Sequence, residues 1–104
     1  MVSYNDLVAN FMNNPRDIST KPIINRPGKW FYVYVENGNI VIDTARLHTP
    51  KCSISKPRIL FRKEIEDIYE LYIQRKKGFS VSQQAASVTM NQVYWYGIFS
   101  EIGL

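Results

Sequence analysis

The spacing of hydrophobic residues predicts a helix near the start of the chain. In positions 3–13, four hydrophobic residues recur three or four positions apart and therefore share one helical face: Tyr4, Leu7, Val8 and Phe11. Ser3 precedes them and Asp6 follows three positions later, close to the pattern with which many helices begin. Because proline disfavours helical backbone at the residue before it, Pro15 predicts that this helix ends by Asn14.

The next segment, from Pro15 to Gly28, contains three prolines, which exclude a regular helix. Its large hydrophobic residues are few and do not form a periodic pattern. We predict an extended surface connector that contacts the rest of the fold through Ile18, Ile23 and Ile24.

The clearest strand is 30–35, in which every residue is aromatic or valine. Asn37-Gly38 and a second β-prone run at 39–42 follow, which together are a strong signal for a β-hairpin. Alternation places Trp30, Tyr32 and Tyr34 on one face of the strand, and Phe31, Val33 and Val35 on the other. Since both sets are hydrophobic, we expect both faces to be covered, or one of them to be a binding surface.

The second half of the chain is predicted to be mainly helical. Positions 61–77 carry a hydrophobic stripe, with acidic residues early and basic residues late, as the helix dipole favours: Phe61, Ile65, Ile68, Tyr69, Tyr72 and Ile73. Gly78 is placed to end this helix in the left-handed conformation. Two shorter helices are predicted at about 81–88 and 90–102, and 58–61 has the composition of a third short strand.

These elements predict a single α+β domain over residues 1–104, because the strands come early and the helices late. A helix and connector (1–28) precede an antiparallel two- to three-stranded sheet with a basic loop (29–61). The helical part (61–104) follows, with a long amphipathic helix against one face of the sheet and two short C-terminal helices.

Composition limits the class of protein. Of the 104 residues, 45% are hydrophobic and 21% are charged, a balance typical of globular domains and unlike that of disordered chains. A single cysteine excludes an intrachain disulfide, and no hydrophobic run approaches the ~18 residues of a membrane span. We therefore expect a cytoplasmic protein without membrane association.

The last two predicted helices share features with a DNA-binding motif. Ala85 is the small residue needed where two helices cross closely, and Met90, Trp95 and Ile98 are the hydrophobic residues of the turn and the inner face. In these features the segment 81–102 resembles a helix-turn-helix, a motif class and not a particular family. Thr89 stands where the turn of such motifs usually has glycine.

The resemblance implies a recognition helix that exposes Asn91, Gln92 and Tyr96, and Asn and Gln side chains form paired hydrogen bonds with adenine. Positions 78–104 contain no Lys or Arg, however, so the phosphate contacts would have to come from another part of the chain. The alternative is a helical hairpin that only packs into the core.

A basic stretch at 44–63 is the candidate source of phosphate contacts. It contains six basic residues and no acidic residue: Arg46, Lys51, Lys56, Arg58, Arg62 and Lys63. The chain has 13 Lys and Arg residues against 9 Asp and Glu residues, which gives a net charge of +4. The positive charge of this stretch alone is larger than that net charge. Two prolines keep part of it extended, which suits contact with a phosphate backbone. A solvated loop with scattered positive charge is the alternative.

The aromatic row Trp30, Tyr32 and Tyr34 has three interpretations. Helices could cover it, or it could form a homodimer interface, because Trp and Tyr are enriched at interfaces. On an open sheet face it could instead stack unpaired bases. Since both faces of this strand are hydrophobic in a short chain, we predict a homodimer that uses these three residues.

His48 and Cys52 are the residues with which a metal site or a catalytic nucleophile could be built. One His and one Cys do not make a metal site, and their spacing around Pro50 does not place them on one helical face. A Cys–His nucleophilic pair is not required by this spacing. A small ribonuclease with His48 as general base and Arg46 and Lys51 on the phosphate is a remote alternative. No motif indicates an enzyme, a cofactor, a metal or a small-molecule ligand.

The leading hypothesis from the sequence is a non-enzymatic nucleic-acid-binding module, which binds DNA through the basic stretch with help from Asn91 and Gln92. The second hypothesis is a protein–protein interaction or homo-oligomerising module. The small ribonuclease is the third.

Overall fold

The computed structural model describes residues 2–22 and 26–104, and it confirms the α+β class. The elements of this part of the chain are, in order, α1 (Tyr4–Asn13), β1 (Arg16–Ser19), β2 (Trp30–Glu36), β3 (Asn39–Thr44), β4 (Arg58–Leu60), the 3-10 turn η1 (Arg62–Glu64), α2 (Ile65–Lys76), α3 (Ser82–Val88) and α4 (Gln92–Glu101). The structure describes only one of the three isoleucines through which the connector was predicted to contact the fold. Ile18 is buried, whereas Ile23 and Ile24 lie outside the described residues.

The sheet is an antiparallel meander with the strand order β1-β2-β3-β4. Its central hairpin has the predicted turn, in which Asn37 and Gly38 both have positive φ angles, 52° and 75°. The expectation of two to three strands was too low, because β1 lies in the segment interpreted as connector. This strand contains a single large hydrophobic residue, and its strand conformation comes from pairing with β2 rather than from its own sequence pattern.

The two faces of the sheet differ in burial. Phe31, Val33 and Ile18 point to the inner face and are fully buried, together with Ile40, Ile42 and Leu60 of the other strands. Trp30, Tyr32 and Tyr34 lie on the outer face and are only partly buried. The predicted alternation along β2 is therefore confirmed, and the helices cover one of its two faces.

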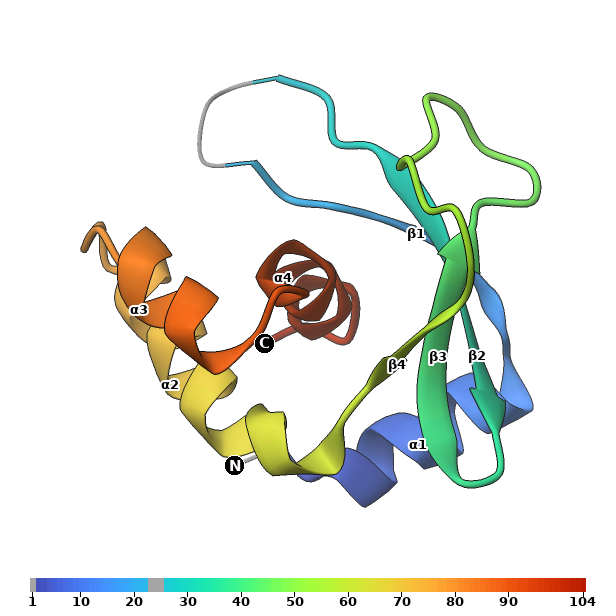
Figure 1. Cartoon of the computed structure of the whole chain (residues 1–104), viewed down its shortest axis with the longest axis horizontal. Coiled ribbons are helices and arrows are strands. Elements are labelled where there is room, and N and C mark those ends of the chain that lie inside the picture. Colours follow the sequence, from blue (N-terminus) through green and yellow to red (C-terminus); the bar gives the residue numbers. More distant parts are fainter. Residues whose placement is uncertain (1, 23–25) are drawn as a thin grey trace.

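Helix α4 occupies the centre of the molecule, between the sheet and the α2–α3 pair (Figure 1). Six consecutive residues, from Tyr94 to Phe99, are buried, as expected for a helix with neighbours on all sides. We had expected the long helix to pack against the sheet, and this is wrong, since α2 packs against α4 instead. Phe61 also leaves the predicted stripe, because it precedes η1 in extended conformation and its side chain is about half exposed.

Gly97 allows α4 to approach the sheet closely. A Cβ atom at this position would lie 2.8 Å from the Ser19 carbonyl oxygen and 3.2 Å from the ring of Phe31. A larger residue would therefore push the helix away from β1 and β2. Helix α4 runs through this glycine without a break.

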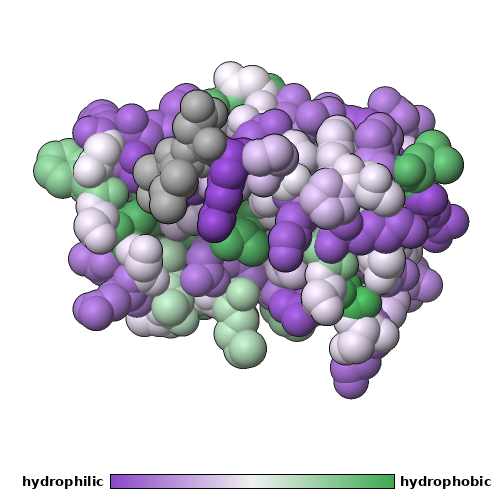
Figure 2. All heavy atoms as spheres, turned by 90° about the horizontal axis from the view of Figure 1, so that it is seen from above, coloured by the Kyte–Doolittle hydropathy of each residue, from purple (hydrophilic) through white to green (hydrophobic). Residues whose placement is uncertain are grey.

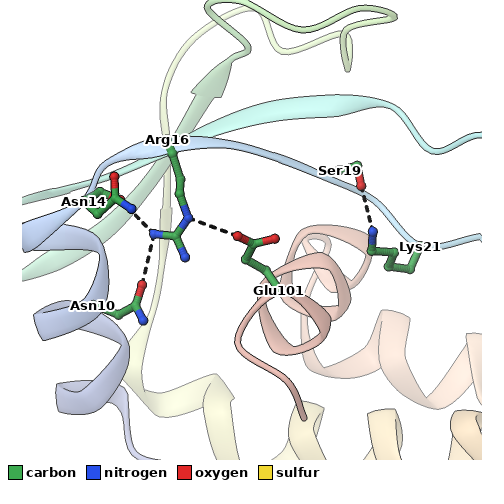
Figure 3. A network of polar contacts seen from close by, with 6 residues as sticks. All are labelled: Asn10, Asn14, Arg16, Ser19, Lys21 and Glu101. Carbon is green, nitrogen blue, oxygen red and sulfur yellow. Dashed lines mark hydrogen bonds and ion pairs between the residues drawn. The ribbon is translucent and has the colours of Figure 1, made fainter.

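Polar contacts hold α1, β1 and α4 together. Ser3 caps α1 as predicted, and its hydroxyl accepts a hydrogen bond from the Asp6 N–H. At the other end of α1, the Arg16 guanidinium contacts Asn10, Asn14 and the Glu101 carboxylate, the last at 3.0 Å (Figure 3). One side chain of β1 thus connects the ends of two helices that are far apart in the sequence.

Candidate nucleic-acid interface

The six residues of the basic stretch lie at three different places. Arg46, Lys51 and Lys56 belong to the long segment between β3 and β4 and are exposed. Arg58 lies on the inner side of the sheet, where its guanidinium donates to the Asn91 side chain at 3.2 Å and lies 5.7 Å from the ring of Tyr94. Since Arg58 and Arg46 are on opposite sides of the sheet, the six residues do not form one surface.

The remaining two, Arg62 and Lys63, start the helical part. The Arg62 guanidinium stacks over the ring of Tyr4 at 4.6 Å, and the Lys63 ammonium lies 5.9 Å from the ring of Phe61. Both residues stand at a helix start, where the dipole favours acidic residues. The aromatic neighbours provide a structural reason for this position.

Asp17 organises the loop that follows β3. This carboxylate lies on the outer face of the sheet, beside Tyr32, and its side chain is only 2% exposed. It accepts hydrogen bonds from three successive backbone N–H groups, those of Arg46, Leu47 and His48, at 2.8–3.0 Å. It also bonds the Nδ1 atom of His48 at 3.0 Å.

These hydrogen bonds change the acidity of Asp17. Burial alone would raise the pKa of the carboxyl group, but the bonds from the loop N–H groups and from His48 outweigh it and lower the pKa to about 2. Asp17 is therefore ionised at neutral pH and fixes the loop on the sheet. No sequence pattern marks this residue, because it is one acidic residue in a short strand that itself was not predicted.

The loop places two planar polar groups against the aromatic row. The His48 imidazole stacks on Trp30, with ring centres 4.0 Å apart, and the Arg46 guanidinium stacks over Tyr32 at 4.2 Å. Tyr34 continues the row, 5.8 Å from Tyr32, and Lys51 pairs with Trp30 through the backbone. We call Trp30, Tyr32, Tyr34, Arg46, His48 and Lys51 the outer-face surface. His48 is 48% exposed there, so its Nε2 edge has access to solvent.

The helix-turn-helix resemblance fails at the recognition helix. Tyr96, which it required at the surface, is 5% exposed, because α4 is the central helix of the fold. Met90, expected to point inward, is 86% exposed. Asn91 and Gln92 are partly buried, and Asn91 binds Arg58. Ala85, Trp95 and Ile98 are buried as the core-packing alternative expects.

The lone cysteine is not placed for chemistry. Cys52 is buried, and burial raises the pKa of its thiol, which is unfavourable for a nucleophile. In the described part of the chain, no three His, Cys, Asp or Glu residues lie close enough together to hold a metal ion. None of the helices in residues 2–22 and 26–104 has the length and hydrophobicity needed to cross a membrane.

Comparisons with known proteins do not add to this picture: no protein-family model, no curated protein and no solved structure matches the chain.

Proposed function

We propose that the protein binds single-stranded nucleic acid on its outer-face surface. The observation that carries the proposal is the row of aromatic rings and cations on the outer face of the sheet, with Arg46 and His48 held on that row by Asp17. Unpaired bases stack on aromatic rings and on guanidinium planes, and cations nearby neutralise the phosphates.

The arrangement favours a single strand over a duplex. The rings of Trp30 and Tyr32 are partly covered by His48 and Arg46, so the outer faces of these two polar groups are the free stacking positions. Bases in a duplex are already stacked and cannot use such positions. The helix expected to enter the major groove, α4, lies in the core. Sequence readout of duplex DNA by Asn91 and Gln92 is therefore no part of this proposal.

Fluorescence titration with short poly-dT and poly-U oligonucleotides tests binding. Of the two tryptophans, Trp95 is fully buried and Trp30 is at the proposed surface, so quenching by the oligonucleotide reports on Trp30. Replacement of both Arg46 and Lys51 by glutamine should weaken binding by at least about tenfold. Arg62→Gln is the matched control, because Arg62 contacts Tyr4 at another place, and it should change the affinity little.

Two results would contradict the proposal: absence of binding at ~50 mM salt, where phosphate contacts are strong, or duplex DNA bound as tightly as the single strand. Sedimentation of the protein alone tests the alternative that the three aromatic residues form a homodimer interface. If Trp30, Tyr32 and Tyr34 form the homodimer interface that the sequence predicts, the protein sediments as a dimer and oligonucleotides compete with dimer formation.

One geometric observation favours a second candidate function, RNA cleavage. Asp17 binds Nδ1 of His48, so the Nε2 atom of the neutral ring is the acceptor and faces outward, beside Arg46 and Lys51. A buried carboxylate that orients a histidine in this way is a common arrangement of a general base. His48 would take the proton of a ribose 2′-hydroxyl, and the 2′-oxygen would attack the adjacent phosphorus. The bond from phosphorus to the 5′-oxygen would break, and that oxygen would take a proton from water.

The cleavage reaction predicts its own products and controls. A 2′,3′-cyclic phosphate and a 5′-hydroxyl end should form from RNA, whereas DNA of the same sequence should stay intact because it lacks the 2′-hydroxyl. His48→Ala should abolish cleavage and keep most of the binding that Arg46 and Lys51 provide. RNA that remains intact with the purified protein would exclude this second function and leave the binding proposal standing.

A further inference from the structure

A cleft lies on a different part of the molecule, between the connector limbs at 20–22 and 26–29 and the helices α2, α3 and α4. It consists of two adjoining hollows of about 420 and 540 Å3, within the size range of small-molecule sites. The hollows share five lining residues: Pro22, Arg26, Arg75, Val93 and Tyr96. Figure 2 views the end of the molecule that carries the connector, where hydrophobic and strongly hydrophilic side chains lie side by side.

All charged side chains in the described lining of the first hollow are positive. Four cations line it, Lys21, Arg26, Lys29 and Arg75, and its described lining contains no acidic residue. Within residues 2–22 and 26–104, no carboxylate lies within 4.0 Å of the nitrogen atoms of these four side chains. Cations gathered without a counter-charge repel one another, and a bound anion removes this repulsion.

Specific contacts hold the walls of the cleft in place. Arg75 donates from Nη2 to the Lys21 carbonyl at 2.5 Å and stacks over the ring of Tyr96 at 4.7 Å. The two limbs of the connector are joined by a pair of hydrogen bonds between Thr20 and Lys29, 2.8 and 3.0 Å long. Gly28 permits this approach, because a Cβ atom there would overlap the Thr20 carbonyl oxygen.

A buried polar group without a partner lines both hollows. The Tyr96 side chain is 5% exposed, and its hydroxyl makes no hydrogen bond to any of the described residues. Leaving such a group unpaired is unfavourable, so it is uncommon in folded proteins. A ligand in the cleft would supply the missing hydrogen bond.

The second hollow shares two of the four cations, Arg26 and Arg75, and adds hydrophobic and short polar side chains to its lining. Phe79 and Val93 line it and are 62% and 47% exposed, so part of their hydrophobic surface is available to a ligand. Ser80, Ser82 and Gln92 also line it. A planar ring is the ligand group suited to this lining, since hydrophobic side chains contact the face of a ring and hydroxyl and amide groups bond to its edge.

We propose that this cleft is a nucleotide-binding site, with the phosphates among the four cations and the base in the second hollow. The two hollows together match the two parts of a nucleotide, an anionic part and a planar part. The site shares no residue with the outer-face surface, so the proposal does not depend on strand binding. A variant of one surface therefore leaves the other intact, and failure of one proposal is distinguishable from failure of the other.

Calorimetric titration with three probes tests both halves of the site: ADP, pyrophosphate and adenosine. We expect ADP to bind most tightly, pyrophosphate more weakly and adenosine most weakly. Equal affinities for ADP and pyrophosphate would overturn the assignment of the second hollow to a base. Lack of binding of ADP and pyrophosphate at ~1 mM would overturn the whole proposal.

Charge variants locate the site. Arg26 and Lys29 are exposed and make no side-chain hydrogen bond within the described part of the chain, so their replacement by glutamine is expected to spare the fold. The double variant should weaken ADP binding by at least about tenfold, since two charge-assisted contacts are lost. Replacement of Lys56 and Lys63, two exposed lysines outside the cleft, is the matched control and should leave the affinity unchanged. An equal loss in both variants would show binding to overall positive charge and overturn the site.

Tyr96→Phe separates a ligand contact from a structural residue. If the hydroxyl binds the nucleotide, this variant is at least as stable as the parent protein and binds ADP several-fold more weakly, since a hydrogen bond to a charged group is lost. Unchanged ADP affinity in a folded Tyr96→Phe variant would remove Tyr96 from the site.

Discussion

The cations of the basic stretch and the four cations of the cleft differ in how their positions in the sequence relate to their positions in the structure. The basic stretch is contiguous in the sequence, yet the fold distributes it over the outer face, the inner side of the sheet and the start of α2. The four cations of the cleft are spread from Lys21 to Arg75 in the sequence, yet they line one hollow. Charge density along a chain is therefore a poor guide to charge density on its surface.

The physical reason lies in the order of the elements and in the connector. The basic run begins in the loop after β3, enters β4 with Arg58 on the inner side of the sheet, and continues into η1, so three different elements carry its members. The connector does the reverse, because its two limbs return antiparallel and the hydrogen bonds between Thr20 and Lys29 place their cations side by side.

The largest effect is expected for Gly97→Val, which displaces the helix that lines the cleft. The new side chain would collide with the Ser19 carbonyl and the Phe31 ring, so we expect a loss of about 3 kcal/mol in the free energy of unfolding. Ala86→Val on the exposed side of α3 is the control and should cost less than about 1 kcal/mol. Denaturant unfolding measures both, and equal midpoints for the two variants would contradict the close packing of α4.

Asp17→Asn should have the next largest effect, confined to the outer-face surface. The folded-state pKa of about 2 lies below the ordinary value of 3.8, so the charged form stabilises the fold above about pH 5 and this contribution is lost as the pH falls toward 2. A difference of nearly two pKa units corresponds to about 2 kcal/mol at neutral pH. The variant should lose that stability near pH 7 and show a flatter pH dependence between about pH 4 and 2.

The control for Asp17 is the exposed Asp67, whose replacement by asparagine should alter neither quantity. Urea unfolding across this pH range measures both variants. ADP binding should survive in Asp17→Asn, because the carboxylate contacts the loop at 46–48 and not the cleft. A parallel loss of oligonucleotide and ADP binding would mean that the two surfaces are coupled.

Salt dependence distinguishes the members of the basic stretch from one another. Each phosphate contact with a single strand contributes about −0.7 to the slope of log affinity against log salt. Loss of Arg46 and Lys51 should flatten the slope by about 1.4, whereas loss of Arg58 and Arg62 should hardly change it, because these two contact Asn91, Tyr94 and Tyr4. Equal flattening in the two double variants would restore the sequence-based hypothesis of one continuous basic surface.

The smallest effect is expected for Asn91→Ala. Its side chain accepts one hydrogen bond of 3.2 Å from Arg58, so the stability cost should be about 1 kcal/mol or less. Binding should be unchanged for every oligonucleotide sequence. A loss restricted to some sequences, measured on a panel of duplexes and single strands, would instead support base readout by α4.

Local patterns in the sequence predicted the elements well. The spacing of Tyr4 and Phe11, the Asn37-Gly38 turn and the position of Gly78, with a φ of 95°, each follow from the chemistry of a few adjacent residues. The alternation along β2 also held, because a period of two distinguishes a buried face from a partly exposed one. Such features do not depend on distant parts of the chain.

Features that depend on distant residues were missed. β1 has one large hydrophobic residue and becomes a strand by pairing with β2, and Asp17 gains its role only when the loop at 46–48 folds onto it. Residues of the cleft come from the connector and from three helices, so no local window of the sequence contains them. Tyr96 was assigned to the surface because the helix-turn-helix resemblance implied a recognition helix, whereas α4 is buried on all sides from Tyr94 to Phe99.

The central position of α4 has a consequence for synthesis on the ribosome. The hairpin of β2 and β3 is complete at Thr44, whereas α4 begins at Gln92, an interval of roughly 2–10 s at ordinary rates of translation. Until α4 emerges, α1 packs on β2 and β3, but the inner-face residue Phe31 lacks its contacts with Gly97 and Tyr94 of α4. We expect this chain to fold only after release of α4, and to depend on chaperones that shield hydrophobic strands in the meantime.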